Sequence, residues 1–96
     1  MLRIAICDDE ETIRNYISGM VSSWTMSRGV DHEIRSFSSA ESFLFEYEGN
    51  PTYDILLLDI EMPGMDGVTM ARRIRERNDL IQIVFITGYS EYIAEG

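Results

Sequence analysis

Short apolar runs alternate along the chain with stretches in which apolar residues recur at helical spacing. Four runs are predicted to be strands. Three of them are expected to be buried, because short apolar segments with β-branched residues are typical of parallel sheets. The four runs cover Leu2–Cys7, His32–Phe37, Tyr53–Asp59 and Ile81–Thr87. The second run is more polar than the others, so we expect it near an edge of the sheet.

Two helices are expected between the first three strands. The first begins near Thr12, ends before Gly29 and carries apolar residues on one face, which we expect to point into the core. These residues are Ile13, Ile17, Met20, Val21 and Trp24. A capping box of Ser38 and Glu41 is predicted to open the second helix. Its inward residues are expected to be Phe43, Leu44 and Tyr47.

A third and a fourth helix complete the alternation. Asp66 is placed to cap the third helix, which runs to about Arg77, and Ser90 is placed to cap the fourth. Strands that alternate with helices in this way predict an α/β fold, a doubly wound parallel sheet with helices on both faces. In such sheets the functional crevice lies beyond the carboxyl ends of the strands.

Polar side chains close three of the predicted strands. Asp8 and Asp9 follow the first strand, Asp59 ends the third and Thr87 ends the fourth. Carboxylates at one rim repel each other, by about 4 kcal/mol for two charges roughly 4 Å apart at an effective dielectric near 20. Hard oxygen ligands that share their shell with water are typical of a Mg²⁺ site. One cysteine and one histidine cannot supply the ligands of zinc or iron–sulfur centres.

A carboxylate beside a metal ion can also act as a nucleophile. Asp59 follows a rigid buried strand, and its oxygen could attack a phosphoryl group in line to form an aspartyl phosphate. The hydroxyl of Thr87 could then donate a hydrogen bond to a phosphoryl oxygen. Pro63, Gly64 and Gly67 would let the chain fold back sharply behind the strand and present loop amides and carbonyls to the ion.

Composition narrows the range of partners. The net charge of −9, from 8 basic and 17 acidic residues, argues against direct binding to nucleic acid or anionic lipid and suits a cation or a basic partner. The single cysteine, Cys7, excludes an internal disulfide framework and fits a reducing compartment. No apolar run is long enough to cross a membrane, and the first residues are too acidic for a signal peptide, so a cytoplasmic protein is expected.

Three segments together resemble the receiver domains of bacterial two-component response regulators. They are ICDDE at residues 6–10, LLLDIEMPGMDG at 56–67 and IVFITGYSEY at 83–92. The last segment is similar to receivers that precede LytTR-type DNA-binding domains. The resemblance implies a flavodoxin-like sheet of strand order 2-1-3-4. It also implies that a sensor histidine kinase phosphorylates the domain in a phosphorelay, and that the domain then switches an attached output, here expected to regulate transcription.

The resemblance also implies a role for each site residue. Asp59 matches the phosphoacceptor, and Thr87 matches the switch hydroxyl that moves toward the phosphoryl group. Of the acidic pair, Asp9 would bind Mg²⁺ directly and Asp8 mainly through water, while Glu61 would offer its backbone carbonyl. The domain is thus expected to be a signalling phosphoprotein with at most slow self-dephosphorylation, and not an enzyme.

The sequence departs from the receiver pattern at its end. Receivers continue into a fifth strand and helix, with a lysine and a switch aromatic near that strand, and this sequence stops at Gly96 before them. No basic residue falls where it could replace the lysine. We therefore expect residues 1–96 to be a truncated receiver without its output domain. The run Ile81–Thr87 would then be an exposed edge, open to dimerisation or exchange of elements.

Two other functions are considered. One is an aspartyl-phosphate phosphohydrolase, because the spacing of Asp59 and Glu61 weakly resembles the paired acids of the haloacid-dehalogenase family. That family, however, has an aspartate at the second position and a longer chain. The other is a pseudo-receiver that dimerises without phosphate, and the intact acidic residues argue against it. A basic run on the third helix is either a solvated face or a kinase-docking surface. It comprises Arg72, Arg73, Arg75 and Arg77.

Overall fold

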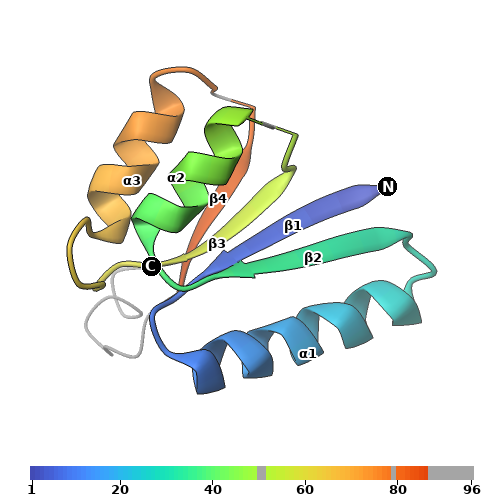
Figure 1. The fold of residues 1–96 in the computed structure, drawn as a ribbon. Coiled ribbons are helices and arrows are strands. Elements are labelled where there is room, and N and C mark those ends of the chain that lie inside the picture. The colour runs from blue at the N-terminus through green and yellow to red at the C-terminus, as the bar shows by residue number, and fades with distance from the viewer. Residues whose placement is uncertain (50–51, 79, 87–96) are drawn as a thin grey trace.

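The chain forms a parallel sheet with helices on both faces (Figure 1). The computed structural model describes residues 1–49, 52–78 and 80–86. The strands are β1 (Leu2–Cys7), β2 (His32–Phe37), β3 (Ile55–Asp59) and β4 (Gln82–Ile86). They pair in the order β2-β1-β3-β4, and every neighbouring pair is parallel. The predicted α/β class and the strand order 2-1-3-4 are confirmed.

Three helices cover the two faces of this sheet. They are α1 (Glu11–Ser27), α2 (Ala40–Gly49) and α3 (Gly67–Arg75). Helix α1 lies on one face, and α2 and α3 lie together on the other (Figure 1). Because side chains alternate along a strand, β1 sends Ala5 and Cys7 into the larger core on the α2–α3 side. The predicted fourth helix at Ser90 lies outside the described residues.

Helix α1 buries less apolar surface than its sequence predicts. Ile17 is buried, but Ile13, Met20 and Trp24 are 39%, 52% and 51% exposed, so the predicted apolar face reaches the core only in part. The helix turns Thr25 toward the sheet instead, and its hydroxyl donates to the carbonyl of Val21 at 2.9 Å. Helical periodicity identified the apolar stripe. Which face of α1 packs against the sheet depends also on the strands beneath the helix, and the spacing of apolar residues alone does not show that.

The second helix begins differently from the prediction. Ser39 caps it, because its hydroxyl oxygen accepts a hydrogen bond from the amide of Ser42 at 3.1 Å. The predicted capping box of Ser38 and Glu41 is therefore wrong, and the Glu41 side chain points elsewhere. Phe43 and Tyr47 are buried as predicted.

The third helix begins as predicted. Asp66 is its N-cap, and the carboxylate accepts from the amide of Thr69 at 2.8 Å. The helix ends at Arg75, two residues before the predicted end, and a turn follows in which the amide of Arg77 bonds to the carbonyl of Ile74.

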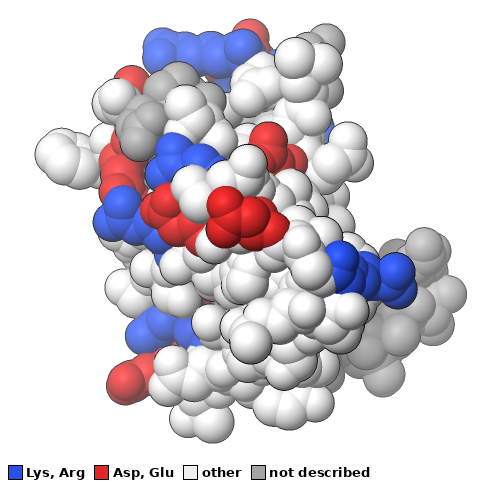
Figure 2. All heavy atoms as spheres, turned by 90° about the vertical axis from the view of Figure 1, so that its right-hand side faces the viewer, with Lys and Arg blue, Asp and Glu red and all other residues white. Residues whose placement is uncertain are grey.

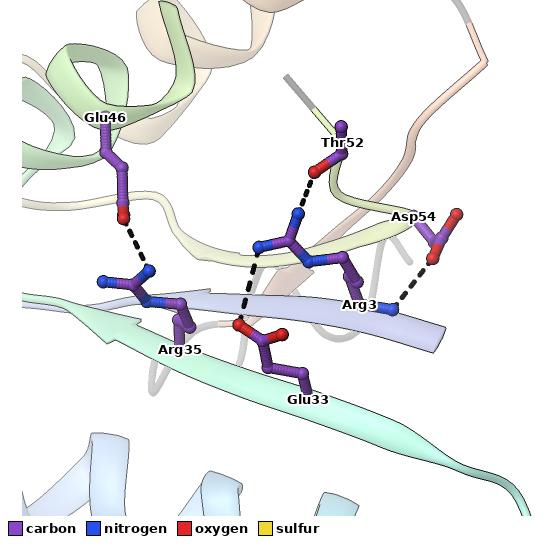
Figure 3. A network of polar contacts seen from close by, with 6 residues as sticks. All are labelled: Arg3, Glu33, Arg35, Glu46, Thr52 and Asp54. Carbon is purple, nitrogen blue, oxygen red and sulfur yellow. Dashed lines mark hydrogen bonds and ion pairs between the residues drawn. The ribbon is translucent and has the colours of Figure 1, made fainter. Parts of the chain in front are cut away.

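Polar contacts brace the end of the sheet at which the strands begin. Figure 2 shows this side of the molecule, with basic and acidic side chains intermixed. Figure 3 shows a close view in which the Arg3 guanidinium reaches Thr52 and Glu33, while the Arg3 amide donates to Asp54 at 2.8 Å. Besides the ion pair of Arg3 with Glu33, a second ion pair joins Arg35 to Glu46 at 2.7 Å. These contacts tie β1, β2, α2 and the segment before β3 together. Those of Arg3 lie at the end where the strands begin, and the Arg35–Glu46 pair lies over the middle of β2.

The two edges of the described sheet differ. Strand β2 lies at one edge and is partly exposed along its length, as its polar sequence predicts. Strand β4 lies at the other edge among the described strands, with Val84 48% and Phe85 44% exposed. Within the described ranges, no helix has the length and apolar content needed to cross a membrane.

Candidate functional site

Three carboxylates meet at the carboxyl ends of β1 and β3. Asp8, Asp9 and Asp59 each place one carboxylate oxygen within 4.8 Å of the others. The register explains the meeting, since Cys7 pairs with Leu58 and each strand runs directly into its aspartate. This is the only such cluster of possible metal ligands among the residues that the structure describes. The structure thus brings together the acidic residues that the sequence placed at neighbouring strand ends.

The environment of the cluster disfavours negative charge. Burial raises the pKa of the Asp59 carboxyl to about 6, and the charges of Asp8 and Asp9 add to the rise. The backbone amides of Glu61 and Ile60 offset part of it by hydrogen bonding to the carboxylate. Burial also raises the pKa of Asp8 above its usual range. Carboxylates that repel each other in a partly desolvated rim favour a bound cation.

Asp8 is held by contacts on the chain that follows it. Its carboxylate accepts from the amide of Glu10 at 2.9 Å, and its carbonyl accepts from the Arg14 guanidinium at 2.8 Å. The pKa of the Asp8 carboxyl is raised by burial, and the hydrogen bond from Glu10 and the positive charge of Arg14 offset part of that rise. Arg14 was not predicted as a site residue. Its position one helical turn into α1 is the only signal that could have identified it.

The loop behind Asp59 closes through two glycines. The amide of Gly67 donates to the carbonyl of Ile60 at 2.8 Å, and a Cβ at Gly67 would lie 2.1 Å from the Asp59 carbonyl oxygen. Gly64 has φ +77°, and with Pro63 before it this fits a type II turn, in which glycine is favoured at the third position. The loop-shaping residues predicted from the sequence therefore each have a steric or conformational reason.

The donor set fits Mg²⁺ better than a soft metal. Carboxylate oxygens are the ligands that Mg²⁺ prefers. The neighbouring Cys7 is fully buried, and burial together with the charges of Asp8 and Asp59 raises the pKa of its thiol to about 12. The thiol therefore stays protonated and donates to the carbonyl of Ser39 at 3.3 Å. His32 lies on β2, where its ring contacts the carbonyl of Val30.

Two predicted site residues remain to be placed. Thr87 lies outside the described residues, so its position at the site stays a prediction. Glu61 is exposed in the loop after β3, and its role as a metal ligand through the backbone carbonyl also stays a prediction. Sequence reasoning missed the contact that Glu41 makes with this loop, because the two segments are 24 residues apart.

Comparison with known proteins identifies relatives across nearly the whole chain. Residues 4–95 match the family described as the response regulator receiver domain. The chain is 32% identical over 88 residues to the response regulator protein TmoT of Ectopseudomonas mendocina, which covers 92% of this chain and 37% of that protein. The chain thus spans little more than a third of this relative.

Solved structures give the same picture. The chain is similar to the response regulator protein TrrA of Thermotoga maritima in complex with Mg(2+)-BeF, with 32% identity and a TM-score of 0.82 over 99% of this chain and 76% of that one. A structure of the histidine kinase ThkA in complex with TrrA matches with 33% identity and a TM-score of 0.79, over 96% of this chain and 73% of that one.

Proposed function

Because the chain belongs to the response regulator receiver domain family, we propose that it accepts a phosphoryl group on Asp59 from a sensor histidine kinase. The observation that carries the proposal is the meeting of Asp8, Asp9 and Asp59 at neighbouring strand ends. TrrA, to which the chain is similar, has been solved in complex with a histidine kinase. The basic run is a candidate docking surface for such a partner. It comprises Arg72, Arg73 and Arg75 on α3 and Arg77 in the turn that follows.

In the proposed reaction a carboxylate oxygen of Asp59 attacks the phosphorus of a phosphohistidine. The new O–P bond forms as the N–P bond breaks, and the electron pair returns to the imidazole, which takes a proton from solvent. Asp59 must be ionised to attack. In the metal-free site the raised pKa of its carboxyl opposes ionisation, and a bound cation would favour it. Strand β3 holds the nucleophile rigidly, and Thr87 is proposed to donate to a phosphoryl oxygen.

Mg²⁺ is the proposed cofactor. Asp8, Asp9, Asp59 and the backbone carbonyl of Glu61 would hold it, with Asp8 acting mainly through water. Bound there, the ion would neutralise charge on the transferring phosphoryl oxygens. The proposal is supported by the all-carboxylate donor set and by the Mg(2+)-BeF complex of TrrA.

The wider role proposed is that of a cytoplasmic phosphoacceptor, not an enzyme, with at most slow self-dephosphorylation. The phosphorylated domain would switch an output that regulates transcription. The chain covers only part of relatives such as NtrC of Klebsiella pneumoniae, which is named a DNA-binding transcriptional regulator and of which the match covers 17%. The likeness of residues 83–92 to receivers of LytTR-type regulators stays a prediction.

We also propose that two copies of the 96-residue chain pair through β4. This strand lies at an edge of the described sheet and exposes apolar side chains on both faces, at Val84 and Phe85. Light scattering at rising concentration should then give a mass approaching twice 11.1 kDa. A constant monomer mass at high concentration would contradict the pairing.

Mass spectrometry tests the proposed function. The full-length gene product is incubated with Mg²⁺ and phosphoramidate, and we expect one added phosphoryl group that is absent in Asp59→Asn. Asp9→Asn serves as a second variant, in which the adduct should need far more Mg²⁺. The absence of any adduct in the wild type would contradict the proposal, and rapid turnover of phosphate esters would favour a phosphohydrolase.

A further inference from the structure

Helix α2 reaches across to the loop that follows Asp59. The carboxylate of Glu41, in the first turn of the helix, accepts a hydrogen bond from the backbone amide of Met65 at 3.2 Å. One oxygen of this carboxylate also lies close to Gly64, where a Cβ would be 2.7 Å from it and 3.6 Å from the other oxygen.

This contact is one of three that fix the same short loop. At its end, Gly67 closes the loop onto Ile60, next to Asp59. On the side of the loop that faces the core, the buried side chain of Met62 contacts the thiol of Cys7, with the two sulfur atoms 3.8 Å apart. Glu41 holds the outer side of the turn, which is otherwise exposed to solvent.

The loop matters because it begins with the chemistry of the site. The backbone amides of Ile60 and Glu61 lower the pKa of the Asp59 carboxyl, so the first residues of the loop act directly on it. A shift of the turn at Gly64 and Met65 would move Glu61 as well, since only two or three residues separate them. Outer groups that orient metal ligands typically contribute about 10-fold to 100-fold in metal affinity.

We propose that Glu41 is a positioning residue for the Mg²⁺ site, which acts by holding the loop that carries Glu61 rather than by touching the ion. The inference rests on the proposed function. It requires the reach of the side chain and a hydrogen-bond acceptor at its end, and it does not require the charge.

Two conservative substitutions separate reach from charge. Glu41→Gln loses the charge but keeps an acceptor oxygen at the same reach, whereas Glu41→Asp keeps the charge but is one methylene shorter. A role in positioning predicts that Glu41→Gln retains most of the Mg²⁺ affinity and that Glu41→Asp loses it. If Glu41 instead acted by stabilising α2 through the helix dipole, Glu41→Asp would be the more stable variant and Glu41→Gln the less stable one. The reason is that a negative charge in the first turn is favoured at the helix N-terminus.

Isothermal titration with Mg²⁺ alone provides the readout, on the full-length gene product. We expect Glu41→Asp and Glu41→Ala to weaken binding by about tenfold, the lower end of the range for outer-shell groups. Glu48, an exposed glutamate later in α2, supplies the matched controls Glu48→Asp and Glu48→Ala, which should bind Mg²⁺ as the wild type does.

A second readout does not depend on the metal. The ¹⁵N–¹H resonance of Met65 should shift in Glu41→Asp and Glu41→Ala and stay near its wild-type position in Glu41→Gln. The inference would be overturned if Glu41→Asp bound Mg²⁺ with the affinity of the wild type. It would also be overturned if Glu41→Gln bound Mg²⁺ as weakly as Glu41→Ala does. A wild type that binds no Mg²⁺ would overturn the proposed function, and this inference with it.

Discussion

The carboxyl of Asp59 illustrates how a functional group can oppose the stability of its own fold. Burial and two neighbouring carboxylates raise its pKa, so at neutral pH the ionised form is held where it is less favourable than in the unfolded chain. A strand used only for structure would not end in this way. The unfavourable charge is what makes the site receptive to a cation.

Removing that charge should stabilise the metal-free protein. The folded pKa of about 6 lies above the usual 3.8, so Asp59 contributes most stability below pH 4, and this contribution is lost as the pH rises to 6. At pH 7.5 we expect the free energy of unfolding of Asp59→Asn to exceed that of the wild type by ~1–2 kcal/mol, after allowance for solvent screening. Urea denaturation with a chelator at pH 4 and 7.5 measures this. An Asn variant less stable than wild type at pH 7.5 would contradict it.

The glycine at the end of the same loop should tolerate no side chain. Gly67→Ala would place a methyl 2.1 Å from the Asp59 carbonyl, so the backbone must move, at a cost of about 1–3 kcal/mol in stability. Gly19→Ala in α1 is the control, because its Cβ meets nothing within 4 Å and alanine favours a helix by about 0.5–1 kcal/mol. Thermal unfolding of both variants checks the prediction, which fails if they change stability in the same direction.

At the scale of elements, the hydrophobic pattern predicted more than local capping signals did. The strands β1 and β2 have the predicted bounds, and each is followed directly by a polar residue, Asp8 after β1 and Ser38 after β2. The start of α2 was missed by one residue. Ser38 and Ser39 are adjacent serines ahead of the same helix, and only the three-dimensional position of Glu41 decides between them.

The two serines offer a direct test of the corrected cap. Ser39→Ala should lower the stability of the protein by about 1 kcal/mol, because the amide of Ser42 loses its acceptor. Ser38→Ala should leave stability nearly unchanged. Chemical denaturation compares the two variants. A larger loss in Ser38→Ala would restore the capping box that the sequence alone suggested.

At the scale of the whole molecule, the sequence predicted where the site lies because topology leaves little freedom. The carboxyl ends of parallel strands lie at one edge of the sheet. A correct strand order therefore places Asp8, Asp9 and Asp59 close together. Contacts between segments distant in sequence could not be predicted in this way. Glu41 with Met65 is one, and the side on which α1 packs is another.

The two ends of the sheet differ in how their charges are arranged. The acidic cluster lies where the strands end, with charges of one sign. At the opposite end, Arg3 pairs with Glu33, and over the middle of β2 Arg35 pairs with Glu46. A charge without a partner of opposite sign favours an added ligand, whereas a paired one braces the structure.

Locating the phosphoryl group tests the central claim most directly. After phosphorylation with Mg²⁺ and phosphoramidate, borohydride reduces an aspartyl phosphate to homoserine, and peptide mass spectrometry finds the altered residue. The account predicts homoserine at position 59, only when Mg²⁺ was present, and not in a sample treated with chelator. Homoserine at another aspartate, or at position 59 without Mg²⁺, would contradict it.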